Sequence, residues 1–109
     1  MVLIGDMNHI SSLVETKFIS AEELEDLKNK CTVGEVCTHF YDIDGNLITN
    51  TINDRVLSID IDSYKNIPLR VGIGKGKESV QSIIGAAKSK LINVLITDSE
   101  TADALSKTI

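Results

Sequence analysis

The sequence predicts a single α/β domain of layered, Rossmann-like type with a mainly parallel sheet. Its 109 residues are enough for one small domain, since independently folding units usually have about 100–150 residues. With 42% hydrophobic and 25% charged residues, the composition is that of a globular protein and excludes collagen-like, disordered and low-complexity classes. The second half of the chain has the order strand, helix, strand, helix, which predicts parallel strands joined by right-handed crossovers.

Charge and the lack of targeting signals argue against nucleic-acid and membrane partners, and the cysteine spacing argues against a metal site. The chain has 11 Lys and Arg against 16 Asp and Glu, a net charge of −5 that has the wrong sign for binding DNA or RNA. It has no run of about 20 apolar residues and no signal-peptide pattern, so we expect a cytoplasmic protein without a membrane partner. Cys31 and Cys37 form no CxxC or zinc pattern, and we interpret them as buried small hydrophobic residues.

The first clear element is a helix from Ala21 to about Lys30. It begins with a capping box, in which the Ser20 hydroxyl accepts a first-turn N–H and Glu23 reaches back to the Ser20 backbone. Acidic residues gather at its start and lysines at its end, as the helix dipole prefers. The pattern predicts a surface helix packed on one side.

Strand-forming residues dominate the middle of the chain. Glu35–Tyr41 predicts a strand, and Asp42–Asn46 predicts a turn in which Gly45 or Asn46 is available for positive φ. The segment Leu47–Asn50 can return as a second strand.

Two further elements precede the single proline. Val56–Ile61 alternates in polarity, which predicts a strand with one face better buried. Ser63–Asn66 then predicts a turn or a short helix.

The strongest unit follows the proline. Leu69–Ile73 predicts a strand, the glycine-rich segment Gly72–Lys77 a turn, and Glu78–Lys88 a helix. Leu91–Ile96 is an apolar run typical of a parallel strand buried on both faces, and Asp98–Leu105 predicts a last helix. We expect the two strands to be parallel neighbours, with one face of the middle helix packed on them: Val80, Ile83, Ile84 and Ala87.

An ordered series of short motifs, running from Val2 to Leu105, resembles a known family. The motifs are Val33-Gly34-Glu35, Phe40-Tyr41-Asp42, Asp44-Gly45, Arg55-Val56, the glycine-rich unit, Leu91 to Asp98, Thr101-Ala102 and Leu105. Together they resemble the C-terminal part of the SorC/DeoR-type sugar-binding domain, which senses phosphorylated sugars for bacterial transcriptional regulators. The resemblance implies a truncated fold of the sugar-phosphate isomerase/deaminase-like group. It also implies that residues 1–109 lack the family's helix-turn-helix and the first half of its sugar domain, including a phosphate loop.

The glycine-rich turn is the best local candidate for binding an anion. A strand that leads through glycines to a helix N-terminus presents N–H groups, and Lys75 and Lys77 add positive charge. A turn that needs its glycines only for its shape remains the alternative, because the spacing matches no phosphate-binding motif. In the family resembled, Gly74, Lys75 and Gly76 align with small residues and Ser79 with a phosphate-binding lysine. Since that lysine is missing, we expect weak phosphate binding.

Other candidates are weighed against structural roles. By the same resemblance, Glu35 corresponds to an acidic position that faces sugar hydroxyls, with a solvent-exposed acid at a strand start as the alternative. Asp42 and Asp44 lack the EF-hand spacing and indicate a hairpin turn, so no metal is implied. His9 and His39 are far apart in the sequence and have no evident partner constellation, so we interpret them as solvated histidines or histidines with structural hydrogen bonds. We interpret Asp98 as a helix cap rather than a ligand contact.

The function expected is therefore non-catalytic. The resemblance implies part of an effector-sensing and oligomerising domain, with no cofactor, that contacts DNA only through a separate helix-turn-helix. Binding of a phosphorylated sugar by these residues alone is expected to be millimolar or undetectable. The alternatives are a small sugar-phosphate isomerase- or deaminase-like enzyme and a dimerisation module that has lost ligand binding.

Overall fold

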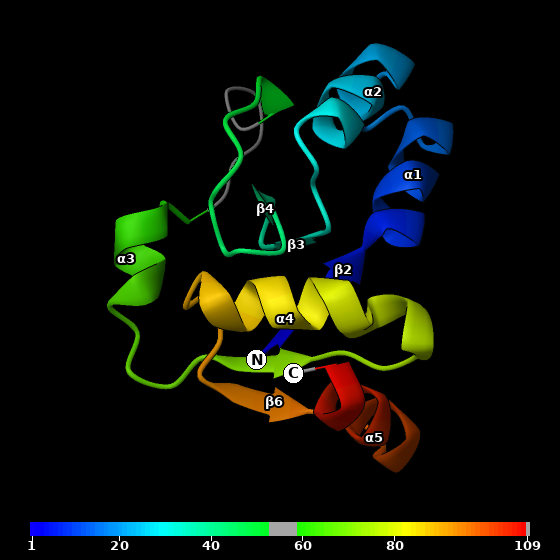
Figure 1. The fold of residues 1–109 in the computed structure, drawn as a ribbon. Coiled ribbons are helices and arrows are strands. Elements are labelled where there is room, and N and C mark those ends of the chain that lie inside the picture. The colour runs from blue at the N-terminus through cyan, green and yellow to red at the C-terminus, as the bar shows by residue number, and fades with distance from the viewer. Residues whose placement is uncertain (53–58, 109) are drawn as a thin grey trace.

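The structure, a computed structural model, describes residues 1–52 and 59–108 (Figure 1). The elements in chain order are β1 (Val2–Leu3), β2 (Gly5–Asp6), α1 (Met7–Glu15), α2 (Ala21–Asn29), β3 (Gly34–Val36), β4 (His39–Tyr41), α3 (Ile61–Lys65), β5 (Val71–Ile73), the 3-10 turn η2 (Lys77–Ser79), α4 (Val80–Lys88), β6 (Val94–Ile96) and α5 (Ser99–Thr108).

The described strands form two small sheets. In the first, the order is β1-β5-β6 and both pairs are parallel, so the predicted parallel neighbours β5 and β6 are confirmed. In the second, β2, β3 and β4 are antiparallel. The α/β class is confirmed, but the antiparallel sheet was not predicted, because its strands have only two or three residues and give no clear period.

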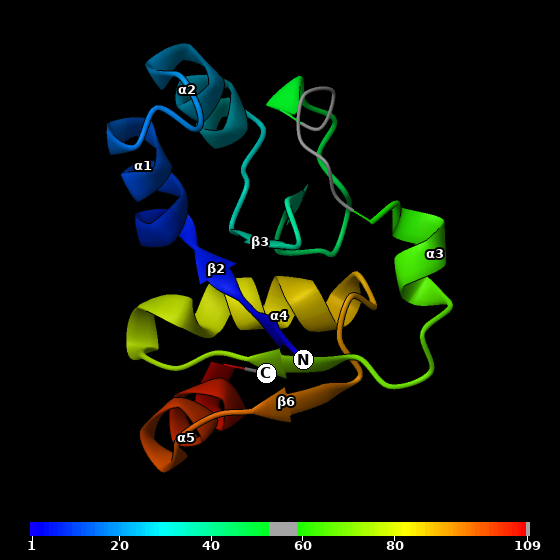
Figure 2. The same cartoon turned by 180° about the vertical axis from the view of Figure 1, so that it is seen from behind.

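Helix α4 lies between the two sheets, as both ribbon views show (Figures 1 and 2). Val80 and Ile83 are buried as predicted, but Ala87 is exposed and Ile84 is only half-buried. The helix instead buries a second face, where Gly85 lies against the Tyr41 ring. The second face of α4 is close to Tyr41 because it carries a small residue there. The apolar stripe of the helix predicts only one buried face.

The predicted strand Glu35–Tyr41 is wrong, because these residues form the hairpin β3–β4. Val36 pairs with His39, which leaves a two-residue turn at Cys37 and Thr38 with φ of 51° and 64°. These angles belong to a type I′ turn, for which Asn-Gly is the usual signal. Since neither Cys37 nor Thr38 is glycine or asparagine, the sequence contains no signal for this turn.

Most of the remaining predicted elements are present. Ser20 caps α2 with a complete capping box, and Gly45 has a φ of 89° in the turn after β4. The returning strand at 47–50 is reduced to one bridge between Tyr41 and Leu47. Of the predicted strand 56–61, residues 56–58 lie outside the described residues, and Ile61 begins α3. Helix α1 was not predicted, although Asp6 caps it.

Among residues 1–52 and 59–108, the parallel sheet is covered on one face only. Leu91 and Ile92 are buried, but the side chains of β6 are not, with Val94 41% and Ile96 46% exposed. Leu3 of β1 is 75% exposed. The prediction that the run 91–96 is buried on both faces is therefore wrong within this chain, since α4 covers only one of them.

The cysteines also differ from prediction. Both are free, but Cys31 is exposed and Cys37 is intermediate in exposure. Each has a positive φ in a turn, Cys31 just after α2 and Cys37 in the β3–β4 hairpin. The Cys37 side chain is partly buried against the larger core cluster, whereas Cys31 lies at the surface. No described helix is long and apolar enough to cross a membrane.

Candidate functional site

A cavity of about 300 Å³ lies where β1 and β5 end. This is the edge at which open parallel sheets usually hold ligands. Its walls include four of the six predicted site residues, Glu35, Gly74, Lys75 and Ser79, but neither Gly76 nor Lys77. Its other lining residues are Leu3, Ile4, Gly5, Asp6, His9 and Ile73.

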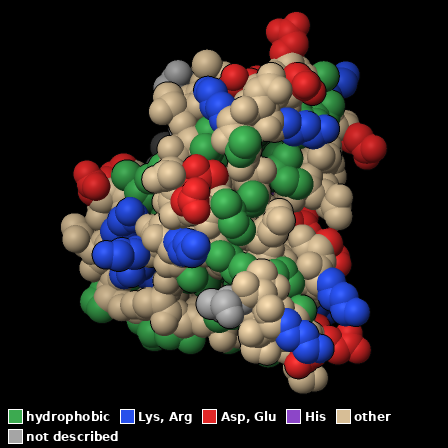
Figure 3. Space-filling view, viewed as in Figure 1, with side chains coloured by type: hydrophobic (Ala, Val, Ile, Leu, Met, Phe, Trp, Pro, Cys, Tyr) green, Lys and Arg blue, Asp and Glu red, His purple; other side chains and the backbone are tan. Residues whose placement is uncertain are grey.

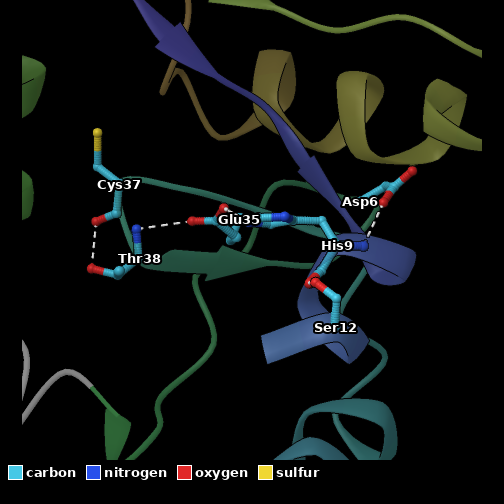
Figure 4. Close-up of polar contacts among 6 residues, drawn as sticks. All are labelled: Asp6, His9, Ser12, Glu35, Cys37 and Thr38. Carbon is cyan, nitrogen blue, oxygen red and sulfur yellow. Dashed lines mark hydrogen bonds and ion pairs between the residues drawn. The ribbon is translucent and has the colours of Figure 1, made fainter. Parts of the chain in front are cut away.

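Glu35 comes from β3 and is an acid of the cavity wall whose side chain is 13% exposed. The Thr38 backbone N–H donates to its Oε2 at 3.0 Å, and His9 Nε2 lies 3.6 Å from its Oε1 (Figure 4). Burial raises the pKa of Glu35, while the Thr38 N–H and the nearby His9 and His39 oppose that rise. The solvent-exposed alternative for Glu35 does not fit this geometry.

Gly5 leaves space for the Glu35 side chain beside β2. The two residues are register partners in the β2–β3 pair. A Cβ at position 5 would lie 2.5 Å from Glu35 Oε1 and 2.8 Å from His9 Cδ2. The carboxylate and the imidazole therefore approach the backbone of β2 where only glycine leaves room.

Asp6 connects the cavity to two helices. Its Oδ1 accepts a hydrogen bond from His9 N at 2.9 Å, which caps α1 and places the His9 ring beside the cavity. Its Oδ2 accepts from Ser79 Oγ at 3.3 Å, at the start of α4. Sequence reasoning missed Gly5, Asp6 and His9, and the cap signal Asp6-x-x-His9 was the clue that could have found them.

The glycine-rich turn uses two of its N–H groups within the protein. Gly74 N donates to Ile96 O at 3.2 Å, and Gly76 N donates to Thr101 Oγ1 at 2.8 Å. Gly76 also has a φ of 101°, a conformation that favours glycine. These bonds join β5 to β6 and α5, and they leave Lys75 as the charged group of this turn on the cavity wall.

The two aspartate interpretations are confirmed. Asp98 Oδ1 accepts from Thr101 N at 2.8 Å in the first turn of α5, which is the geometry of a helix cap. Asp42 Oδ1 accepts from the backbone N–H groups of Asp44 and Asn46, which stabilises the predicted turn. These hydrogen bonds lower the pKa of both carboxyl groups.

Comparison with known proteins identifies the family. A family model described as "Putative sugar-binding domain" matches residues 1–107. The chain is 36% identical to the sorbitol operon regulator of Klebsiella pneumoniae over 83% of its own length and 29% of that protein. It is 35% identical to the transcriptional regulator LsrR of Escherichia coli K12 over 70% of its length and 24% of that protein.

A solved structure gives the same result for the fold. A transcriptional regulator from Streptococcus pneumoniae TIGR4 superposes with a TM-score of 0.85 at 28% identity, over 98% of this chain and 41% of that one. The chain thus spans less than half the length of each of these proteins. From the match across residues 1–107 and the agreement in fold, the chain belongs to the family of sugar-binding domains of SorC/DeoR-type bacterial transcriptional regulators.

Proposed function

We propose that the cavity between Gly5, Glu35 and Lys75 binds a phosphorylated sugar as the effector of a transcriptional regulator. The observation that carries the proposal is the convergence of Glu35, from the antiparallel sheet, with the turn after β5 on one cavity. The residues come from separate parts of the sequence, and their convergence at a strand-end edge supports a ligand site.

The two sides of the cavity suit the two parts of such a ligand. Glu35 is an acceptor for sugar hydroxyls, since an ionised carboxylate has about four lone-pair sites. Lys75 supplies positive charge for a phosphate, whereas the Ser79 hydroxyl on the same wall already donates to Asp6 Oδ2. Because Gly74 N and Gly76 N are already engaged, the phosphate side has few donors, and we expect millimolar affinity.

The proposed role is sensing rather than catalysis, within a cytoplasmic regulator. The relatives named above are regulators, and ligand binding in such proteins shifts an equilibrium between conformational states. An isomerase-like enzyme is the second candidate, because the buried Glu35 beside His9 is a geometry that can serve acid–base chemistry.

Contact with DNA is proposed to occur through another part of the regulator. The chain carries a charge of −5, and the face in Figure 3 mixes acidic with basic side chains.

Self-association is proposed to use the uncovered face of the parallel sheet, where Leu3 and Ile96 are exposed. Sedimentation equilibrium tests this directly: Ile96→Lys is expected to shift the distribution toward monomer, and a wild-type chain that is monomeric at high concentration contradicts it.

The binding proposal is tested with D-ribose 5-phosphate as a representative sugar phosphate. We expect a dissociation constant in the millimolar range by NMR titration, weakened about tenfold by Lys75→Gln or Glu35→Ala. Exposed Lys107 in α5 offers a matched control, and Lys107→Gln is expected to leave binding unchanged. Phosphorus NMR of the same samples decides between sensor and enzyme, because turnover of the sugar would refute the sensor.

A further inference from the structure

Two polar atoms of the cavity wall face each other at ion-pair distance but without a hydrogen bond. His9 Nε2 and Glu35 Oε1 are 3.6 Å apart, which is too long for a hydrogen bond (Figure 4). No described residue donates a hydrogen bond to Oε1, whereas Oε2 is held by the Thr38 N–H. The carboxylate is thus fixed through one oxygen and offers the other to the cavity.

The remaining acid of the cavity is already engaged. Asp6 accepts from His9 N through one oxygen and from Ser79 Oγ through the other. It caps the first turn of α1 and so fixes the backbone position of His9. Among the described carboxylates of the cavity, Glu35 therefore has the freest acceptor, and His9 Nε2 is the donor beside it when it carries a proton.

The donor of His9 and the acceptor of Glu35 together match a ligand with two adjacent hydroxyls. An imidazole N–H donates, and a carboxylate oxygen accepts. A hydroxyl both donates and accepts, so two adjacent hydroxyls can span the pair, one donating to Oε1 and its neighbour accepting from Nε2. A lone hydroxyl that bonded both atoms at about 2.8 Å would form an angle of about 80° between them, well below the tetrahedral angle, so its two hydrogen bonds would be bent and weak.

We propose that His9 and Glu35 form a clamp for a vicinal diol, and that His9 determines specificity for sugars that carry one. The inference rests on the proposed function and extends it to a sugar class, those with two hydroxyls on neighbouring carbons. Gly5 supports the clamp by letting both side chains lie against β2, where a Cβ would lie 2.5 Å from Oε1.

The test uses a matched pair of ligands, D-ribose 5-phosphate and 2-deoxy-D-ribose 5-phosphate, which differ by one hydroxyl of a vicinal diol. NMR titration of the 109-residue chain is expected to give about tenfold weaker binding for the deoxy sugar, the equivalent of one hydrogen bond to a charged group. In His9→Phe, which retains a ring but no N–H donor, the two ligands are expected to bind alike. His9→Gln restores a donor and is expected to recover part of the preference.

Exposed Asn8 lies next to His9 in α1 but does not line the cavity, so Asn8→Ala is the matched control and is expected to retain the full preference. Unfolding curves verify that each variant is folded. An unchanged preference in His9→Phe refutes the clamp and leaves the proposed function standing. Failure of the wild-type chain to bind either ligand refutes both.

Discussion

Gly5→Ala is the substitution that most directly perturbs the geometry of the cavity. Gly5 has no positive φ, so alanine brings no backbone strain and acts only through its Cβ. That atom would lie 2.5 Å from Glu35 Oε1, against 3.4–4 Å for ordinary contact, so the carboxylate must retreat by about 0.9 Å. Such a shift breaks or lengthens its 3.0 Å hydrogen bond from Thr38 N.

The expected cost follows from these contacts. A lost hydrogen bond to a charged group costs about 1.5–3 kcal/mol. Replacing glycine with alanine returns about 0.4–1 kcal/mol through the unfolded chain. The net loss is about 0.5–2.6 kcal/mol in the free energy of unfolding, which urea denaturation followed by circular dichroism measures.

A double-mutant cycle isolates the cause. In a Glu35→Ala background there is no carboxylate to displace, and only the exposed His9 ring, 2.8 Å from the new Cβ, must move. Gly5→Ala is therefore expected to cost less than about 0.5 kcal/mol in that background. An equal cost in both backgrounds would show that Gly5 acts through some other contact. No cost in either would refute the close approach between Gly5 and Glu35.

Three further outcomes follow from the hairpin and the buried side chains. Burial raises the pKa of Glu35 above 4.5, so the stability contributed by its protonated form is present below about pH 4.5 and lost as the pH rises through the raised value. Glu35→Gln is therefore expected to gain stability relative to wild type between pH 4 and pH 7 in urea unfolding, and a constant difference contradicts this. Replacing Cys37 and Thr38 with Asn and Gly, which suit a type I′ turn, should raise the unfolding free energy by about 1 kcal/mol; a loss of stability argues against that turn. Tyr41→Phe removes the buried bond from the Tyr41 hydroxyl to Ser82 O and should cost about 1 kcal/mol, whereas an unchanged denaturation midpoint would show that the bond adds nothing.

Local sequence patterns were sufficient to predict a structural feature where a few neighbouring residues determine it. The capping box at Ser20 predicted the start of α2, and Gly45 predicted the positive φ of its turn. The order of elements after the proline predicted the parallel neighbours β5 and β6. The cap and the turn are each determined by a few neighbouring residues. The parallel pairing is determined by a crossover connection, which is almost always right-handed.

Other features depend on contacts that the sequence does not contain. The turn at Cys37 and Thr38 adopts angles that its residues do not favour, so the surrounding sheet must impose them. The second buried face of α4 depends on Tyr41, which is 41 residues from Ser82 in the sequence. The family resemblance directed attention to Glu35 and Ser79, but only the three-dimensional arrangement brought His9 and Gly5 beside them.

The central claim is that one cavity, formed where β1 and β5 end, holds the effector. The most direct measurement is a residue-resolved NMR map of backbone amide shifts as the 109-residue chain is titrated with D-ribose 5-phosphate. The account predicts millimolar binding, with the largest shifts at Gly5, Glu35, Gly74, Lys75 and Ser79. Shifts gathered elsewhere, for example around α2, would contradict it, as would a micromolar dissociation constant, because a phosphate side with so few free donors is too poor for such affinity.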